Sequence, residues 1–152
     1  MTQEEKQLLL KDLCARFPHG VKVWRHGAHY VISCIDIEKQ RVYLKVDFEA
    51  TRGWWFDIEE VKLYLRPMSS MTYEEMQEAR EKFFDGSDHY DIDNIGEIYA
   101  DTYQPYTTVY TLSFARLSGY IDWLNSHHFD YRGLIGKGLA IEVTEENNPY
   151  KN

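Results

Sequence analysis

The stretch RVYLKVDF, residues 41–48, decides the fold, because apolar and polar side chains alternate along it without a break. Side chains that alternate with a period of two lie on opposite faces of a β-strand. The apolar members are Val42, Leu44, Val46 and Phe48. The pattern predicts a strand with one face in the core and the other in solvent.

Further strands are predicted on both sides of this stretch. The connections at Gly27 and at residues 38–40 are too short for parallel crossovers, which indicates an antiparallel meander. A single helical turn capped by Asp57 and Glu60 interrupts the later part. The predicted strands cover residues 21–26, 29–37, 54–56 and 61–65.

A helix is predicted before the sheet, over residues 3–16. Thr2 and Glu5 form a capping box at its start, and Pro18 and Gly20 follow its end. Asp12 and Arg16 add a favourable pair four residues apart. The predicted apolar face consists of Leu10, Leu13, Cys14 and Phe17.

The second half of the chain predicts mainly helices. Thr72 and Glu75 repeat the capping box before a helix that ends near Asp85 and Gly86. Ser118 caps a helix that reaches His127. The remaining predicted elements are a strand over 107–115, a short helix over 130–138 with Gly138 after its end, an edge strand over 139–143 and a frayed tail.

These elements predict one α+β domain over residues 1–152, with a helix and sheet in 1–66 and a helical, acidic-loop part in 67–152. The sheet is small and antiparallel, with a half-barrel as an open alternative, and the N-terminal helix and C-terminal helices pack against it. The predicted core comprises Leu10, Leu13, Phe17, Val23, Ile32, Val42, Leu44, Val46, Val61, Leu65, Phe83, Ile121 and Leu124.

The charge balance argues against direct nucleic-acid binding. There are 17 Lys and Arg against 25 Asp and Glu, a formal net charge of −8, and no basic face to grip phosphates or anionic lipids. No apolar run approaches the ~20 residues of a membrane helix, and no targeting segment is expected. Cys14 and Cys34 are expected to be reduced core residues of a cytoplasmic protein, with a disulfide between them as the alternative.

The aromatic residues provide the best binding candidate. Trp54 and Trp55 adjoin Phe56, and in a strand Trp55 must point away from the other two. One interpretation is a partner-binding patch, because Trp is enriched where proteins meet. The alternative is that helices cover both faces of this strand.

The histidines are weak metal or catalytic candidates. His127 and His128, with Asp130, lie where a helix is predicted to end, so capping and packing are the favoured roles. His26 and His29 flank a predicted turn and lack a third zinc ligand.

Residues 83–115 hold six carboxylates and no Lys or Arg, which favours a solvated loop, an ion site or a surface for a basic partner. The EF-hand pattern fails there. Asp85, Asp88, Asp91 and Asp93 are therefore predicted, with the two tryptophans, to bind a partner. No nucleotide-binding, hydrolase or zinc-protease motif is present, so no catalytic residue, cofactor or metal is predicted.

Two stretches, LYLRPMSSMTYEE (63–75) and WLNSHHFDYRGLIGKGLAIE (123–142), resemble segments of small uncharacterised proteins of gut Bacteroides-type bacteria and of their phages and mobile elements. The resemblance implies a soluble accessory protein acting inside a bacterial cell, and it implies no chemistry.

Three functions follow as hypotheses. The first is a non-enzymatic protein-binding module of a bacterial, phage or mobile-element system. The second is an acidic mimic of nucleic acid that binds a basic protein. The third is a small metal-dependent hydrolase that uses His127, His128 and Asp130.

Overall fold

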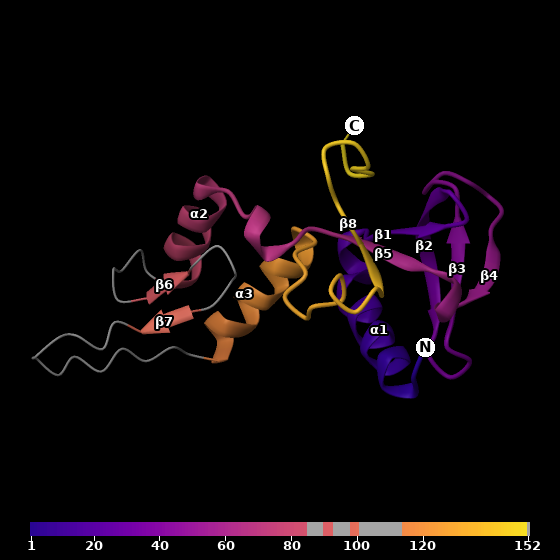
Figure 1. Cartoon of the computed structure of the whole chain (residues 1–152), viewed down its shortest axis with the longest axis horizontal. Helices are drawn as coiled ribbons and strands as arrows, with labels where there is room; N and C mark the ends of the chain where they lie inside the picture. The colour runs from indigo at the N-terminus through magenta and orange to yellow at the C-terminus, as the bar shows by residue number, and fades with distance from the viewer. Residues whose placement is uncertain (85–89, 93–97, 101–113, 152) are drawn as a thin grey trace, which may run out of the picture. The chain divides into compact units, whose positions relative to one another are not determined.

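The computed structural model in Figure 1 describes residues 1–84, 90–92, 98–100 and 114–151. The chain divides into two compact units, which we call the sheet unit (Met1–Arg66 with Arg132–Asn152) and the helical unit (Pro67–Tyr131). Helices and a mostly antiparallel sheet confirm the α+β class. None of the helices in the described part of the chain is long and apolar enough to cross a membrane.

Helix α1 (Gln3–Arg16) begins and ends where the sequence predicts. The Thr2 hydroxyl accepts the N–H of Glu5 at 3.2 Å, and the Glu5 carboxylate accepts the N–H of Thr2 at 2.7 Å. After it, the short 3-10 helix η1 (Phe17–His19) and Gly20, with a φ of 68°, turn the chain into the sheet. The capping box and the stop signal are both confirmed.

The buried face of α1 is shifted by one residue from the predicted apolar face. Leu9 and Leu13 are fully buried in the core of the sheet unit, and Asp12 and Arg16 complete the same face. Leu10 is only half-buried. Phe17 is 39% exposed, so its assignment to the core is wrong. Hydropathy counts Asp12 and Arg16 as surface residues, whereas the two side chains pair with each other inside.

The sheet has the strand order β4-β3-β2-β1-β5-β8. All neighbours are antiparallel except β5 and β8, which are parallel. A parallel pair needs a long connection, and here that connection contains the helical unit. The edge strand predicted over 139–143 is confirmed as β8. The strands are β1 (Lys22–Arg25), β2 (Ala28–Asp36), β3 (Arg41–Lys45), β4 (Trp54–Asp57), β5 (Lys62–Leu65) and β8 (Ala140–Glu142).

Strand β3 is shorter than its alternation predicts. Val42 and Leu44 are fully buried, but the strand ends at Lys45. Val46 and Phe48 lie in the connection to β4 and are exposed, so the assignment of Val46 to the core is wrong. The predicted core residues that are buried in this unit are Leu13, Val23, Ile32, Val42, Leu44, Val61 and Leu65.

The cysteines do not fill the core as expected. The pairing of β2 with β3 shifts register between Ile32 and Cys34, and Cys34 is exposed after this irregularity. Its assignment to the core is therefore wrong. Cys14 is half-buried, and both thiols are free, so the alternative of a disulfide between them is wrong.

The helical unit is built on α2 (Tyr73–Phe84) and α3 (Phe114–Ser126), with a small antiparallel pair, β6 (Tyr90–Ile92) and β7 (Ile98–Ala100). The Thr72–Glu75 capping box is confirmed by both of its hydrogen bonds. The core of the helical unit is mostly aromatic and includes Phe83 and Leu124, as predicted. Ile121, also predicted in the core, is only partly buried and packs against it. The buried members are Met71, Ala79, Phe83, Phe84, Tyr120, Trp123, Leu124 and Phe129.

Two helix predictions in this region are wrong. Ser118 lies inside α3 rather than at its start. Residues 130–138 form turns instead of a short helix, although Gly138 has the expected positive φ of 71°. The predicted strand over 107–115 lies outside the described residues up to 113, and α3 begins at Phe114.

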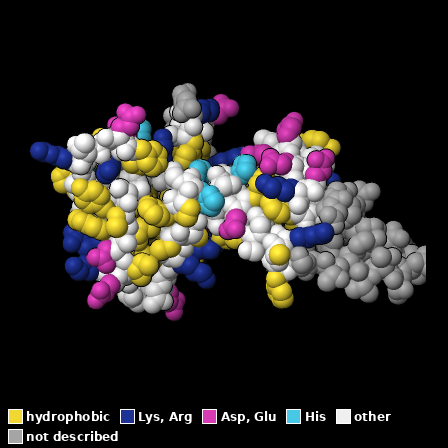
Figure 2. All heavy atoms as spheres, turned by 180° about the vertical axis from the view of Figure 1, so that it is seen from behind, with side chains coloured by type: hydrophobic (Ala, Val, Ile, Leu, Met, Phe, Trp, Pro, Cys, Tyr) yellow, Lys and Arg dark blue, Asp and Glu magenta, His cyan; other side chains and the backbone are white. Residues whose placement is uncertain are grey.

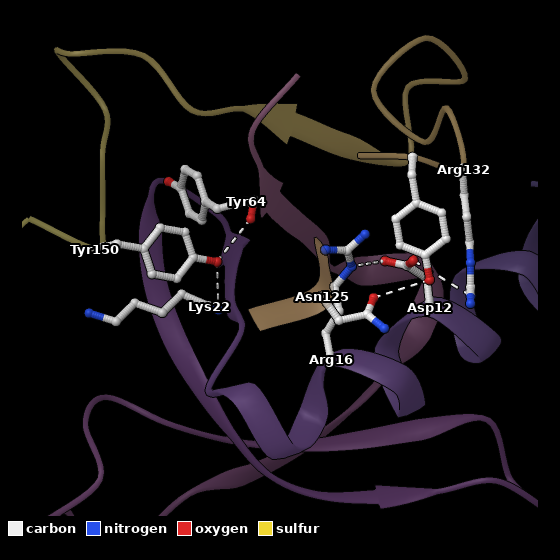
Figure 3. A network of polar contacts seen from close by, with 8 residues as sticks. Asp12, Arg16, Lys22, Tyr64, Asn125, Arg132 and Tyr150 are labelled. Atoms are coloured by element: carbon white, nitrogen blue, oxygen red, sulfur yellow. Dashed lines mark hydrogen bonds and ion pairs between the residues drawn. The ribbon is translucent and has the colours of Figure 1, made fainter. Parts of the chain in front are cut away.

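The Thr144–Tyr150 segment is ordered rather than frayed. Asn147 closes a turn, because its side chain accepts the N–H of Thr144 at 2.7 Å and donates to the carbonyl of Glu142 at 2.9 Å. Tyr150 then reaches β1 and β5, where its hydroxyl accepts the N–H of Lys22 and donates to the carbonyl of Tyr64 (Figure 3). Polar side chains that bond to the backbone order this tail without an apolar pattern.

A buried ion pair lies on the inner face of α1. The Nε of Arg16 donates to Asp12 Oδ2 at 2.6 Å, and both side chains are fully buried. A second guanidinium, of Arg132, approaches the other carboxylate oxygen at 3.6 Å (Figure 3). Residue 132 begins the segment that returns to β8, so this carboxylate links the first helix to that segment.

Replacing Asp12 should destabilise the protein strongly. In Asp12→Ala the Arg16 charge loses its closest buried counter-charge, so we expect the free energy of unfolding to fall by about 3–5 kcal/mol. Urea denaturation measures it. Glu59→Ala is the matched control, because Glu59 pairs with Lys6 at the surface and its loss should cost about 1 kcal/mol or less. Equal losses for the two variants would contradict the buried role.

Stability at high pH should depend on Tyr150. Burial raises the pKa of its phenol well above the ordinary value of about 10. Above pH ~10 the unfolded chain releases this proton while the folded chain keeps it, so the free energy of unfolding falls as pH rises. The stability difference between wild type and Tyr150→Phe should be constant below pH ~9 and shrink by up to about 1.4 kcal/mol per pH unit above pH ~10. A difference that does not change with pH in urea titrations would contradict this.

Candidate partner-binding surface

The edge strand β4 carries both tryptophans of the predicted partner-binding surface. Trp54 and Trp55 are consecutive, so their side chains point to opposite faces of the sheet. Trp54 is 55% exposed and Trp55 is 40% exposed. The alternative that helices cover both faces of this strand is therefore wrong.

Trp54 is the outermost residue of a row of cross-strand neighbours whose inner members are buried. It pairs with Leu44 on β3, and Leu44 pairs with Ile32 on β2. Both of these neighbours are buried. Because directly paired residues share a face, the cover in this row ends between Leu44 and Trp54, whereas Phe56 further along β4 still packs against the core.

Two more apolar side chains are exposed in the β3–β4 connection just before Trp54. Val46 is 56% and Phe48 is 65% exposed. The Phe48 ring comes within 3.7 Å of the position that a Cβ would take at Gly20, so the connection folds back toward the end of η1. We call Val46, Phe48 and Trp54 the apolar rim. Figure 2 shows hydrophobic side chains gathered on the surface of the sheet unit.

On the opposite face, Trp55 packs against Tyr43. The two ring centroids are 5.3 Å apart, and the planes are tilted by 59°. The Tyr43 hydroxyl also accepts the N–H of Gly53 at 2.9 Å. A side chain at Gly53 would collide with the carbonyl oxygen of Leu44, so a glycine is required where the chain enters β4.

The open edge of β4 offers few backbone groups. The N–H of Ile58 donates to the carbonyl of Gln40 at 3.0 Å. In an antiparallel ladder, residues whose backbone groups bond to the neighbouring strand alternate with residues whose groups point away from it. Counting back from Ile58, the N–H and C=O of Trp55 point toward the open edge. The flanking N–H of Gly53 is bound by Tyr43, and that of Asp57 by the Glu60 carboxylate at 3.2 Å. Recognition at this edge therefore depends on side chains more than on an added strand.

Charges near β4 are paired with each other. Arg41 lies 3.5 Å from the Asp57 carboxylate, and Arg25 bonds to Glu60 at 2.7 Å. That hydrogen bond holds the pKa of Glu60 below its usual value. The Arg25 guanidinium also lies 3.8 Å from the centroid of the Phe56 ring. The charges of Arg25 and Arg41 are thereby compensated.

His127 and His128 end helix α3, as the sequence suggests. His128 has a φ of 60°; its N–H donates to Asn125, and the N–H of Phe129 donates to Leu124. These two bonds with a left-handed residue are the Schellman motif that closes helices. The His127 ring lies 4.2 Å from the Trp123 ring, and its Nδ1 is 2.9 Å from the carbonyl oxygen of that residue.

The other metal candidates do not form a cluster. His26 occupies the β1–β2 turn with a φ of 47°, His29 is exposed on β2, and Asp130 is buried after α3. Over residues 1–84 and 114–151, no three His, Cys, Asp or Glu side chains come together in a way that could hold a metal ion.

The acidic candidates cannot be placed in this way. Asp85, Asp88 and Asp93 lie outside the described residues, and only the backbone of Asp91, within β6, is described. The partner-binding assignment therefore rests on the two tryptophans. Sequence reasoning missed Val46 and Phe48, because their alternation with Val42 and Leu44 placed them on the buried face.

The sheet unit also has an open hollow between α1 and the β2–β3 turn. Its volume is about 230 Å³. Its Lys6 ammonium pairs with the Glu59 carboxylate, so two of its charges compensate each other. The lining residues are Lys6, Lys39, Gln40, Asp57, Ile58 and Glu59.

Comparison of the chain with protein-family models, with curated proteins and with solved structures gave no match. The function proposed below is therefore argued from the residues of this chain.

Two substitutions on one cross-strand pair should separate the exposed from the covered part of the sheet. Leu44→Ala removes a fully buried side chain and should lower the free energy of unfolding by about 2–5 kcal/mol. Trp54→Ala should cost about 1 kcal/mol or less, because its ring already contacts water. Urea denaturation of both variants measures this. A loss at Trp54 as large as that at Leu44 would place Trp54 in the core.

Proposed function

We propose that this chain is a non-enzymatic protein-binding module, whose contact surface is the β4 edge of the sheet unit. The observation that carries the proposal is the exposure of Trp54, on a row whose inner members are buried, together with the exposure of Val46 and Phe48 in the connection that leads to it. Large aromatic side chains dominate the binding energy of protein interfaces when a partner excludes water from them. Exposed apolar patches are typical of such interaction sites.

The chemistry around the rim favours an apolar partner surface. Two nearby arginines, Arg41 and Arg25, are already paired with Asp57 and Glu60, so their charges are compensated. The strand edge offers mainly the backbone groups of Trp55. We therefore expect a partner protein that inserts apolar side chains over the rim and stays bound at high salt, because burial of apolar area is not screened.

We place this interaction in a reducing compartment, the cytoplasm of a bacterial cell. The support is the state of the cysteines: both are free, and Cys34 is exposed. Exposed free thiols are uncommon in oxidising compartments.

A photo-crosslinking residue at position 54 tests the proposal. The matched control carries the same residue at position 73, because Tyr73 is 68% exposed but belongs to the helical unit. We expect position 54 to crosslink one protein that position 73 does not. Trp54→Ala and Phe48→Ala should each weaken binding of that purified partner at least about 30-fold, the loss typical of a hot spot.

The salt dependence of the affinity and the folding of the variants distinguish apolar recognition at the rim from ionic recognition. The affinity should change little between about 0.1 M and about 1 M salt. Equal crosslinking from both positions, or unchanged affinity of a folded Trp54→Ala variant, would refute the rim as the contact surface. A complex lost at high salt would instead favour recognition through acidic residues.

A further inference from the structure

The ladder between β1 and β5 stops one pair early. Val23 pairs with Leu63 and Trp24 pairs with Lys62. The next pair of a continued ladder would be Lys22 with Tyr64. The Lys22 N–H and the Tyr64 carbonyl would then bond directly. We call this place, where the two strands separate, the seam.

The Tyr150 hydroxyl occupies the seam. It accepts the N–H of Lys22 at 3.1 Å and donates to the carbonyl of Tyr64 at 2.9 Å (Figure 3). One hydroxyl thereby satisfies both backbone groups that the missing ladder bond would have satisfied. Burial keeps the pKa of Tyr150 high, so the phenol stays protonated and can donate.

A second contact holds the residue before the tyrosine. The ammonium of Lys22 donates to the carbonyl oxygen of Pro149 at 2.6 Å, and Pro149 is buried. The Tyr150 N–H is bound within its own segment, by the side chain of Asn148 at 2.9 Å. The seam thus contacts a Pro-Tyr pair at three points: one carbonyl oxygen and both sides of a phenol hydroxyl.

We propose that the seam is a binding site for Pro-Tyr segments, which Pro149 and Tyr150 fill as a tethered ligand. Each contact belongs either to the backbone of β1 and β5 or to Lys22, so the site is formed by the sheet and not by the segment. A Pro-Tyr segment supplied on another chain meets the same groups. The Thr144–Tyr150 segment then acts as an internal competitor, which keeps the site closed until it is displaced.

The site should be specific for tyrosine. A pocket that bonds a hydroxyl from both sides rejects the analogue without it, because its own buried donor and acceptor are then left unpaired. A phenylalanine segment has the same ring but cannot bridge the seam.

A peptide titration of the full chain tests the proposal. The Tyr150→Ala variant removes the phenol that bridges the seam, and the probe is a fluorescent peptide with the sequence Asn-Asn-Pro-Tyr-Lys of residues 147–151. We expect binding to this variant, with an apparent Kd at least about tenfold higher for wild type, since its site is available only when the segment is released. A peptide with Phe in place of Tyr should bind the variant at least about tenfold more weakly.

The outcomes are decisive when folding is checked by circular dichroism. A folded Tyr150→Ala variant that ignores the tyrosine peptide, or that binds both peptides equally, would overturn the proposal. Should Tyr150→Ala fail to fold, Tyr150→Phe takes its place, because the phenyl ring keeps the packing while the hydroxyl is lost. The tyrosine peptide should then displace the segment at a concentration at least about tenfold lower than in wild type, and equal concentrations would also overturn the proposal.

Discussion

The burial of one sheet face under α1 is the constraint on which the sheet unit depends. Leu9 and Leu13 of the helix share one core with residues from β1, β2, β3 and β5. An α-helix is about 10 Å wide and cannot cover a six-stranded sheet, whose strands are about 4.8 Å apart. Part of an edge strand therefore remains outside this cover, although Phe56 of β4 still packs against the core. Leu44 is buried and its partner Trp54 is not, which marks where the cover ends.

The elements were predictable wherever local chemistry decides them. Capping boxes at Thr2 and Thr72, the alternation in β3 and the turn at Gly27 all act over a few residues, and all are present. The phase of α1 was not predictable from hydropathy. Asp12 and Arg16 can occupy the inner face because each compensates the charge of the other. A hydropathy pattern that assigns every charged residue to solvent therefore places the buried face of α1 one residue too far along the chain.

Only part of the binding surface was predictable, because the sequence pattern does not show where β3 ends. The tryptophans stand out in the sequence, and their opposite orientations follow from the strand. The contribution of Val46 and Phe48 depends on the end of β3 at Lys45, which the unbroken alternation conceals. The seam escaped sequence reasoning altogether. It joins Lys22 and Tyr64 to a residue more than 80 positions later, through a single hydroxyl in a polar segment.

The rim and the seam would recognise their partners by opposite means. The rim offers apolar area with few unpaired hydrogen-bonding groups, so its energy would come from excluded water and depend little on sequence. The seam offers two backbone groups in fixed positions, so its selectivity would come from the cost of leaving them unsatisfied. Strands β2 and β3 separate Trp54 on β4 from β1, a distance of about 14 Å at ordinary strand spacing, whereas Phe48 of the rim lies near Gly20, two residues before Lys22 of the seam. Substitutions that far apart with no shared contact act nearly independently, so a change at Trp54 should not alter binding at the seam.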